Sequence, residues 1–334
     1  MGASAGGVKA LSSVVGALPR EVNAAIFIVL HMPPDKPSNL PRILERAGAL
    51  PCAHAQDGEK IQNGKIYVAP PDYHLLLNRG FVRVLRGPQE NRFRPAIDAL
   101  FRSAARAYGP KVLAVLLSGA LDDGTVGQQY IKRQGGVTIV QDPDEAEFPW
   151  MPRSALRYVQ VDQCVPLAEI PSVLLRLIDE PAPEGEAEPV PKEMEFEANI
   201  AEQQMNTQEF LDNVEQIGIR TSYTCPACSG SIWQIGNENP LRFRCHVGHS
   251  FTAEPFLAEQ TSHIEDVLWA AVRALEEKVT LMRQLAQRMK QQGNSSVAIR
   301  YEDYAQKIDG EVSIVRELIL NGFATKRNIV AGEK

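Results

Sequence analysis

Apolar runs alternate with helix-like segments over the first 178 residues, and this alternation constrains the fold more than any other feature. Residues 24–30 (AAIFIVL), 111–119 (KVLAVLLSG) and 137–142 (VTIVQD) are rich in Val, Ile and Leu, as strands covered on both faces are. The helix-like segment at 95–109 opens with Pro95 and closes with Gly109. We predict a mostly parallel α/β sheet, with functional side chains beyond the carboxyl ends of the strands.

Shorter segments complete this pattern. The residue patterns predict helices at 8–18, 38–48, within 123–136 and at 167–178, and short strands at 65–70, 73–78 and 81–86. The turn sequences PPD and NRG lie between those three strands, so we expect a hairpin or a meander there.

The composition changes after residue 178. Between 179 and 197 there are eight acidic residues against one lysine, with four prolines, so we interpret 179–200 as a charged, solvated linker. After it we predict a short helix at 208–217, a module resembling a zinc ribbon at 218–252 and a helical hairpin at 253–323. The first domain is then 1–178.

The predicted hairpin rests on an apolar stripe with helical spacing. Its members before the break at 293–296 are Leu268, Val272, Leu275, Val279, Met282 and Met289, and those after it are Val297, Tyr301, Tyr304, Ile308, Val312 and Val315. Such a stripe is either the core of the hairpin or a seam through which copies of the chain form a homo-oligomer.

A serine lies between spaced glycines at the start of the chain, in the order Gly2-Ala3-Ser4-Ala5-Gly6. G-x-S-x-G is the pattern of a turn that exposes a nucleophilic serine between a strand and a helix. The spacings of dinucleotide-binding and P-loop motifs are absent from this turn. No strand precedes Ser4 in the sequence, so we expect the natural chain to start upstream and Ser4 to be mobile without that strand.

A serine nucleophile needs a base and a group that orients the base. His31 directly follows the run at 24–30, and Asp122 and Asp123 follow the run at 111–119. Because the carboxyl ends of parallel strands meet at one edge of a sheet, these side chains can converge with Ser4. The structural alternatives are a packed polar histidine and an aspartate that caps the next helix. The chain order Ser, His, Asp differs from that of α/β-hydrolases, chymotrypsin-like enzymes and subtilisins.

Several motifs in register resemble one family, the CheB-type protein-glutamate methylesterases, over residues 1–178. They are GASAGGVKAL, VLHMPP, YVAPPDYHLLL, RPAIDALFRSAA, LSGALDDGTVG and QDPDEAEFPWMPRSAL. The resemblance implies a doubly wound α/β fold, with Ser4 as nucleophile, His31 as base and Asp123 as the orienting acid. It implies demethylation of glutamyl methyl esters and deamidation of glutamine on chemoreceptors or similar signalling proteins, without a catalytic cofactor.

The sequence departs from the family pattern in two places. A Gly-Met-Gly common in the family stands here as Gly119-Ala120-Leu121, close to where the resemblance places oxyanion donors, the others being near His31. We also expect no phosphorylatable receiver domain of the kind that the well-known chemotaxis enzyme carries. The predicted ribbon and helices resemble C-terminal extensions of some CheB-like proteins.

Three of the five cysteines fall in a second motif. Cys225-x2-Cys228 is followed after sixteen residues by Cys245-x3-His249, a spacing typical of tetrahedral zinc. His246 or His249 could be the fourth ligand, and we favour His249 because an immediate neighbour of Cys245 would point away. Four protein ligands indicate a structural Zn²⁺ site, and free thiols are the alternative. Cys52 and Cys164 stand alone, so no disulfide framework is expected.

The formal net charge of −6 argues against nucleic acid as the main partner. Neither a membrane-spanning run nor a signal peptide is visible, so we expect no membrane insertion and a cytoplasmic protein. The competing hypothesis to a serine esterase is a non-catalytic signalling scaffold that binds partners through its ribbon and helices.

Overall fold

The computed structural model describes residues 1–181, 189–202, 205–237 and 239–321. Seven parallel strands form the central sheet in the order β3-β4-β2-β1-β7-β8-β9. Their bounds are β1 (Gly2–Ala3), β2 (Ile26–Leu30), β3 (Cys52–His54), β4 (Ile66–Val68), β7 (Leu113–Leu116), β8 (Val137–Gln141) and β9 (Gln163–Val165). The α/β class predicted from the alternating runs is confirmed.

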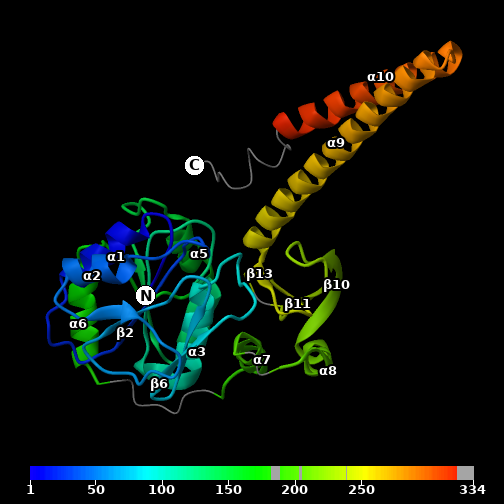
Figure 1. Cartoon of the computed structure of the whole chain (residues 1–334). Coiled ribbons are helices and arrows are strands. Elements are labelled where there is room, and N and C mark those ends of the chain that lie inside the picture. Colours follow the sequence, from blue (N-terminus) through cyan, green and yellow to red (C-terminus); the bar gives the residue numbers. More distant parts are fainter. Residues whose placement is uncertain (182–188, 203–204, 238, 322–334) are drawn as a thin grey trace. The chain divides into compact units, whose positions relative to one another are not determined.

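Helices cover both faces of this sheet, which makes the fold doubly wound. On one face lie α1 (Gly7–Gly16), α2 (Leu40–Ala47) and α6 (Ile170–Asp179), and on the other α3 (Ile97–Tyr108), α4 (Thr125–Arg133) and α5 (Trp150–Tyr158). Figure 1 shows α1, α2 and α6 together on one side of β2 and α3 on the other. Successive residues of β2 face opposite sides of the sheet. Ile28 packs in the core beneath α1, α2 and α6, and Val29 packs in the core beneath α3, α4 and α5.

The shortest strand, β1, lies at the centre of the sheet. Gly2 pairs with Val29 of β2 and with Leu116 of β7, and the Met1 amino group donates a hydrogen bond of 2.6 Å to the Phe27 carbonyl. The expectation that Ser4 lacks a supporting strand is therefore wrong. Two residues suffice because both neighbouring strands offer backbone partners to them.

A two-stranded antiparallel sheet of β5 (His74–Asn78) and β6 (Phe81–Leu85) supplements the main sheet. Of the predicted hairpin or meander, β5 and β6 form a hairpin, whereas the third predicted strand is β4 of the main sheet. The strand β3, the strand β9 and the helix α5 lie in segments for which the sequence predicted no element.

The expected linker at 179–200 is only partly a linker, because α7 (Lys192–Ala201) is a helix. Met194 and Phe196 are buried, and so is Glu197, whose carboxylate accepts a 2.7 Å hydrogen bond from Arg242. The acidic composition hid the helix α7, because Arg242, which neutralises the buried Glu197, lies far away in the sequence. Residues 182–188 of the expected linker lie outside the described residues.

A four-stranded antiparallel sheet follows α7 and α8 (Thr207–Ile217). It consists of β10 (Gly218–Thr224), β11 (Ser231–Ile235), β12 (Arg242–Cys245) and β13 (Ser250–Thr252), in that order. We call residues 218–252 the ribbon. By its contacts the chain divides into Met1–Leu257 and a second unit that begins at Ala258; the proposed domain boundaries stay predictions.

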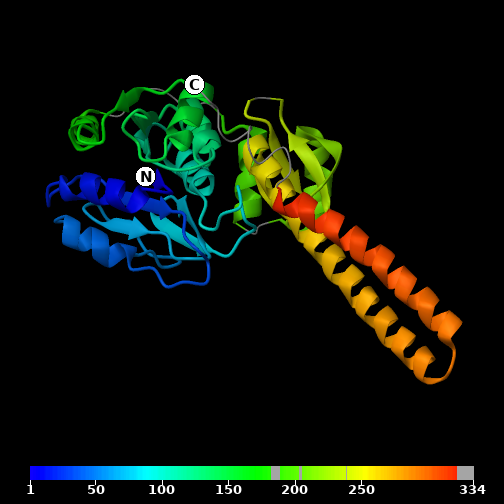
Figure 2. The ribbon, with the colours of Figure 1, turned by 90° about the horizontal axis from the view of Figure 1, so that it is seen from above.

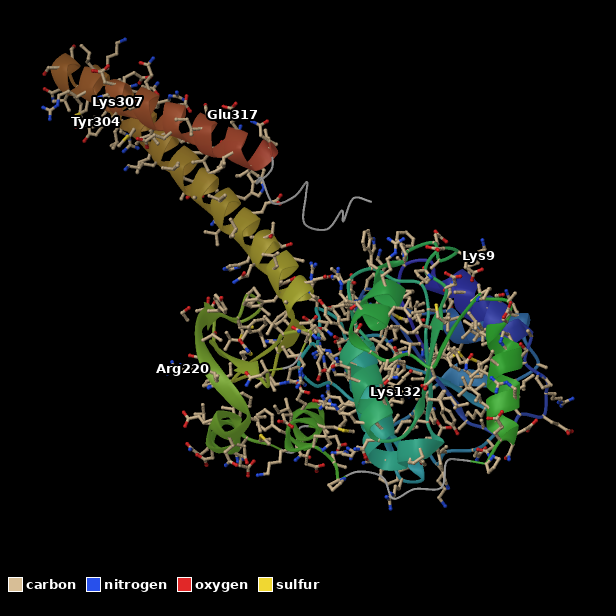
Figure 3. The ribbon with its side chains drawn as sticks, turned by 180° about the vertical axis from the view of Figure 1, so that it is seen from behind. Lys9, Lys132, Arg220, Tyr304, Lys307 and Glu317 are labelled. Carbon is tan, nitrogen blue, oxygen red and sulfur yellow. The ribbon has the colours of Figure 1, made fainter. Side chains whose placement is uncertain are left out.

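The helices α9 (Ala253–Gln291) and α10 (Ser295–Leu320) run antiparallel (Figure 2), and the second unit contains α10 and the part of α9 from Ala258 onward. Val272 and Val279 pack with Ile308 and Val312, and Arg283 donates to Asp309 at 3.0 Å. The apolar stripe is thus a core between the helices. Tyr304, which the stripe included, is exposed, and Lys307 lies over its ring (Figure 3).

Association through these helices stays a prediction, and residues 322–323 of the proposed hairpin lie outside the described part. Among the helices described, none is long and apolar enough to cross a membrane.

Candidate active site

Ser4 lies in the turn between β1 and α1, at the carboxyl edge of the sheet. Its N–H donates to the Ser118 carbonyl at 3.0 Å, and its own carbonyl accepts from Gly7 N–H at 2.9 Å. Gly6 has φ +73°, and a Cβ there would lie 2.8 Å from Ser118 Oγ. Only glycine fits a left-handed position so close to its neighbour, which explains the spacing of the motif.

His31 follows β2 directly and faces Ser4. The Ser4 hydroxyl donates to His31 Nδ1 at 3.1 Å, and His31 Nε2 donates to Asp123 Oδ2 at 2.7 Å. The Phe93 ring stacks on the imidazole, with centroids 3.6 Å apart and planes 9° from parallel. Nδ1 faces the serine and Nε2 the aspartate, which reverses the chymotrypsin arrangement but leaves an acceptor for the hydroxyl proton.

The Asp123 carboxylate is buried and accepts four hydrogen bonds. Besides His31, the donors are Ile97 N–H at 2.6 Å, Asn91 Nδ2 at 3.0 Å and Asp98 N–H at 3.2 Å. Ile97 and Asp98 open α3, so the carboxylate lies at a helix N-terminus, where negative charge is favoured. Burial raises the pKa of Asp123, but the bonds from His31 and the other donors outweigh it and lower the pKa overall.

Asn91 and Asp98 were missed by the sequence analysis, as was Phe93. Asn91 donates to both Asp98 and Asp123, and Asp98 also accepts from Gly127 N–H at 2.6 Å. Burial and the Asp123 charge raise the pKa of Asp98 well above its usual value. Asn91 lies in a loop with a φ of +49°, and such long-range contacts leave no periodic signal in a sequence.

Asp122 points away from the triad, toward the ribbon. Its Oδ1 accepts a hydrogen bond of 2.7 Å from Thr252 Oγ1. Burial raises the pKa of Asp122 to about 7. The alternative that one of the two aspartates caps the next helix is wrong, because Gly124 is the N-cap of α4 and neither carboxylate bonds there.

In the turn after β7, the backbone N–H of Gly119 is not free to stabilise an oxyanion. Gly119 N–H donates to the Phe148 carbonyl at 2.9 Å, so it is already used. Gly119 also packs against Met151, whose sulfur would lie 2.0 Å from an added Cβ. Leu121 has φ +63°. An oxyanion donor in this turn would therefore have to come from Ala120 or Leu121.

The four predicted metal ligands meet in the ribbon. The ligand atoms of Cys225, Cys228, Cys245 and His249 all lie within 4.8 Å of one another. His249 Nδ1 is 3.6 Å from Cys245 Sγ and 3.8 Å from Cys225 Sγ, so His249 rather than His246 joins the thiols. The hydrogen bond between Cys245 and Cys225 lowers the pKa of Cys245 and raises the pKa of Cys225, which favours the thiolate form, the form that binds metal, at Cys245.

Comparisons with known proteins cover the first half of the chain. The family model for CheB methylesterase matches residues 1–174. A Leptospira interrogans protein, named as a candidate protein-glutamate methylesterase/protein-glutamine glutaminase, is 38% identical over 178 residues, which are 53% of this chain and 92% of that protein.

Two further matches agree with it. A protein-glutamate methylesterase/protein-glutamine glutaminase of Methanosarcina mazei is 36% identical over 53% of this chain and 51% of its own length. The crystal structure of the Thermotoga maritima CheB methylesterase catalytic domain superposes with a TM-score of 0.51 at 34% identity, over 53% of this chain and 95% of that domain. This likeness supports the doubly wound fold.

Proposed function

Since the chain belongs to the CheB methylesterase family, we propose that it is a serine hydrolase acting on glutamyl methyl esters of chemoreceptors or similar signalling proteins. The same acyl chemistry would deamidate glutamine. Family membership confirms the resemblance noted in the motifs and the predicted enzyme class. The substrate protein and the catalytic residues are our proposal.

One observation carries the proposal, namely the chain of hydrogen bonds from Ser4 through His31 to Asp123. Its two links measure 3.1 Å and 2.7 Å, and the side chains of His31 and Asp123 are only 3% and 1% exposed. A serine hydroxyl bonded to a free imidazole nitrogen, with an ionised carboxylate behind the ring, is the arrangement that activates serine for acyl transfer. A scaffold that only binds partners has no need for it.

The reaction follows from these positions. Ser4 Oγ attacks the γ-carbonyl carbon of the ester while His31 Nδ1 takes its proton. The tetrahedral intermediate then expels methanol, which leaves with that proton, and Ser4 carries the glutamyl acyl group. His31 next removes a proton from water, which attacks the acyl carbon. His31 then returns that proton to Ser4 Oγ as the bond between the acyl carbon and Oγ breaks, and glutamate is released. Asp123 remains ionised and stabilises the imidazolium. We place the oxyanion near the turn after Gly119, within reach of backbone N–H groups.

Methanol release from methylated receptor tests the proposal. Ser4→Ala and His31→Ala should each lower kcat by several orders of magnitude with little change in KM, because the triad acts in the chemical step. Ser13→Ala, an exposed serine on α1, is the control and should retain full activity. Full turnover by Ser4→Ala would overturn the triad, and no turnover by any form of the chain would favour the scaffold hypothesis.

We further propose that Cys225, Cys228, Cys245 and His249 hold a structural Zn²⁺ ion. Three thiols and one imidazole nitrogen within 4.8 Å of one another match the preferred donors of zinc, and four protein ligands leave no open position. Metal analysis of the full chain should find one zinc per molecule, lost in Cys228→Ser. Zinc-free protein with all three thiols reactive would contradict this assignment.

A further inference from the structure

The loop at residues 89–93 contacts two members of the triad at once. Asn91 Nδ2 donates to Asp123 Oδ1 at 3.0 Å, and the Phe93 ring stacks on His31. Glu90 and Phe93 exchange backbone hydrogen bonds of 3.1 and 2.8 Å, so the loop is closed on itself. The position of this loop therefore determines the geometry of the hydrogen bond between the His31 imidazole and the Asp123 carboxylate.

The last strand of the ribbon, β13, pairs with this loop. Asn91 N–H donates to the Ser250 carbonyl at 2.8 Å, and Ser250 N–H donates to the Gln89 carbonyl at 3.2 Å. Thr252 N–H donates to Asn91 Oδ1 at 2.9 Å, while its hydroxyl donates to Asp122 at 2.7 Å. The Asn91 side-chain amide thus links the ribbon to Asp123: its oxygen accepts from the ribbon, and its nitrogen donates to Asp123.

Buried ion pairs hold the same two parts together. Arg102 on α3 donates to both Glu90 oxygens, at 3.1 and 2.6 Å, and Arg244 on β12 lies 3.3 Å from Glu90. Arg244 is also 3.3 Å from Glu197. Because a buried charge that loses its partner is strongly unfavourable, these pairs fix β12 against the loop.

Two of the metal ligands flank the turn that leads into β13. Cys245 ends β12 and His249 immediately precedes β13; Cys245 N–H donates to the His249 carbonyl at 3.0 Å. Arg244 Nη1 donates to the Gly248 carbonyl in that turn at 2.8 Å. A Cβ on Gly248 would come within 2.6 Å of Pro88, so the turn is packed against the start of the loop. An ion held by Cys245 and His249 fixes this turn.

From these contacts we propose that the ribbon is a positioning element for the triad. Metal occupancy of the Cys225–Cys228–Cys245–His249 site orders the turn before β13, β13 holds Asn91 through Thr252, and Asn91 holds Asp123 for catalysis. Asn91 and Thr252 are positioning residues in this scheme. The inference rests on the proposed function, and it makes the rate of ester hydrolysis depend on a metal site that shares no ligand with the triad.

Two assays on the full chain separate this inference from the proposed function. The first measures kcat and KM for methanol release from methylated receptor. The second measures the rate at which a fluorophosphonate labels Ser4, which requires an activated serine but no natural substrate. If the zinc-loaded chain labels Ser4 but hydrolyses no glutamyl ester, the proposed function fails while the second assay still tests the inference.

Removal of zinc with a strong chelator should lower kcat and the labelling rate about tenfold, a typical size for coupling between sites, with little change in KM. Re-addition of Zn²⁺ should restore both rates in proportion to the metal bound. Unchanged rates in the metal-free, still folded chain would overturn the proposal. Far-ultraviolet circular dichroism and thermal unfolding establish that the chain is folded.

Substitutions locate the path of the coupling. Asn91→Gly, which suits the positive φ, removes the amide that joins Thr252 N–H to Asp123. It should lower kcat about tenfold and make the remaining activity insensitive to zinc removal, because the link is already broken. Thr252→Val loses the hydroxyl donated to Asp122 but keeps the backbone N–H that bonds to Asn91, so it should retain the zinc dependence. Thr221→Val is the control, because the hydroxyl that it loses bonds only within the ribbon: it donates to the Ile232 carbonyl at 3.0 Å and accepts from Tyr223 N–H at 3.2 Å.

The decisive comparison is the effect of zinc in Asn91→Gly. If zinc removal lowers its rates as much as those of the wild-type chain, the coupling does not pass through Asn91 and the proposal is wrong. A Thr221→Val variant with the same loss as Asn91→Gly would show a general effect of ribbon stability, and would also overturn it.

Discussion

At the scale of single residues, the Asp123 carboxylate is held by more hydrogen bonds than a carboxylate exposed to solvent would need. Four donors converge on its carboxylate, two of them backbone N–H groups at the start of α3. These bonds fix both oxygens, so that the carboxylate can accept from only one orientation of the imidazole. The aspartate therefore sets the tautomer of His31 rather than taking its proton.

Asp123→Asn tests this role. An amide can present a donor where the carboxylate accepts, so His31 would lose the tautomer that leaves Nδ1 free for the Ser4 proton. We expect kcat to fall by about 10⁴-fold, as for the corresponding change in other serine triads, with KM nearly unchanged. Asp35→Asn, at an exposed position, is the control. A loss below about tenfold would show that Asp123 does not orient the base.

Gly6→Ala tests the tight turn around Ser4. Gly6 has φ +73° and would place its Cβ 2.8 Å from Ser118 Oγ, whereas Gly58 has φ +76° and nothing within 4 Å. Gly58→Ala carries the same backbone strain and should lower the free energy of unfolding by about 1 kcal/mol. Gly6→Ala adds the steric contact, about 1–3 kcal/mol more, and should also lower kcat. Equal losses in urea unfolding would contradict the close packing.

The buried carboxyl group of Asp122 predicts how the stability of the folded protein changes with pH. Its pKa is raised to about 7 by burial, so between about pH 4 and pH 7 the folded state holds a proton that the unfolded state has lost. The folded protein therefore loses stability from this group as pH rises, by up to about 1.4 kcal/mol per pH unit. Urea unfolding across this range should show a flatter dependence in Asp122→Asn than in wild type. Parallel curves for the two proteins would be the contrary result.

The sequence singled out Ser4 by its G-x-S-x-G spacing, and His31 and Asp123 because they come after apolar runs whose ends converge in a parallel sheet. It could not predict Asn91 or Phe93. Their contacts with the triad depend on a loop with left-handed backbone at Asn91 and on β13, which is 161 residues away for the bond from Thr252 to Asn91. No local pattern encodes such a pairing.

At the scale of elements, the antiparallel hairpin of α9 and α10 is held by one apolar seam. Ile308 is 8% exposed, whereas Ile299 on the same helix is 62% exposed. Ile308→Ala should therefore lower the free energy of unfolding by about 2–4 kcal/mol, and Ile299→Ala by less than about 0.5 kcal/mol. Thermal unfolding followed at 222 nm measures both. Similar losses at the two positions would place Ile299 in a contact between copies of the chain.

The helix α7 and the strand β1 were missed because neither shows a local signal in the sequence. The helix α7 was concealed because Glu197 looks solvated in a list of acidic residues, yet Arg242 and Arg244 neutralise it from 45 and 47 residues away. The strand β1 was concealed because two residues show no periodicity. Burial by distant partners, unlike the 3.6-residue or two-residue period, is invisible in a local window.

At the scale of the whole first unit, buried charges join residues 1–178 and α7 to the ribbon. Glu90 pairs with Arg102 and Arg244, and Glu197 pairs with Arg242 and Arg244. Burial alone would raise the pKa of Glu90, but Arg102 and Arg244 lower it to about 2, and the pKa of Glu197 is lowered in the same way. Their stabilisation is present above about pH 4.3 and is lost as pH falls below it.

Cooperative unfolding of this unit follows from those pairs. Trp150 lies in α5 and Trp233 in β11, so two variants that keep only one of them, with Trp269→Phe in both, report on the two parts separately. Protonating Glu90 leaves Arg102 without its carboxylate, and protonating Glu197 does the same to Arg242. Both tryptophans should therefore report the same urea midpoint, and the two midpoints should fall together as pH is lowered from about 5 to 3. A Trp233 transition at lower urea than that of Trp150 would mean that the ribbon opens first, and would weaken its role as a fixed support for Asn91.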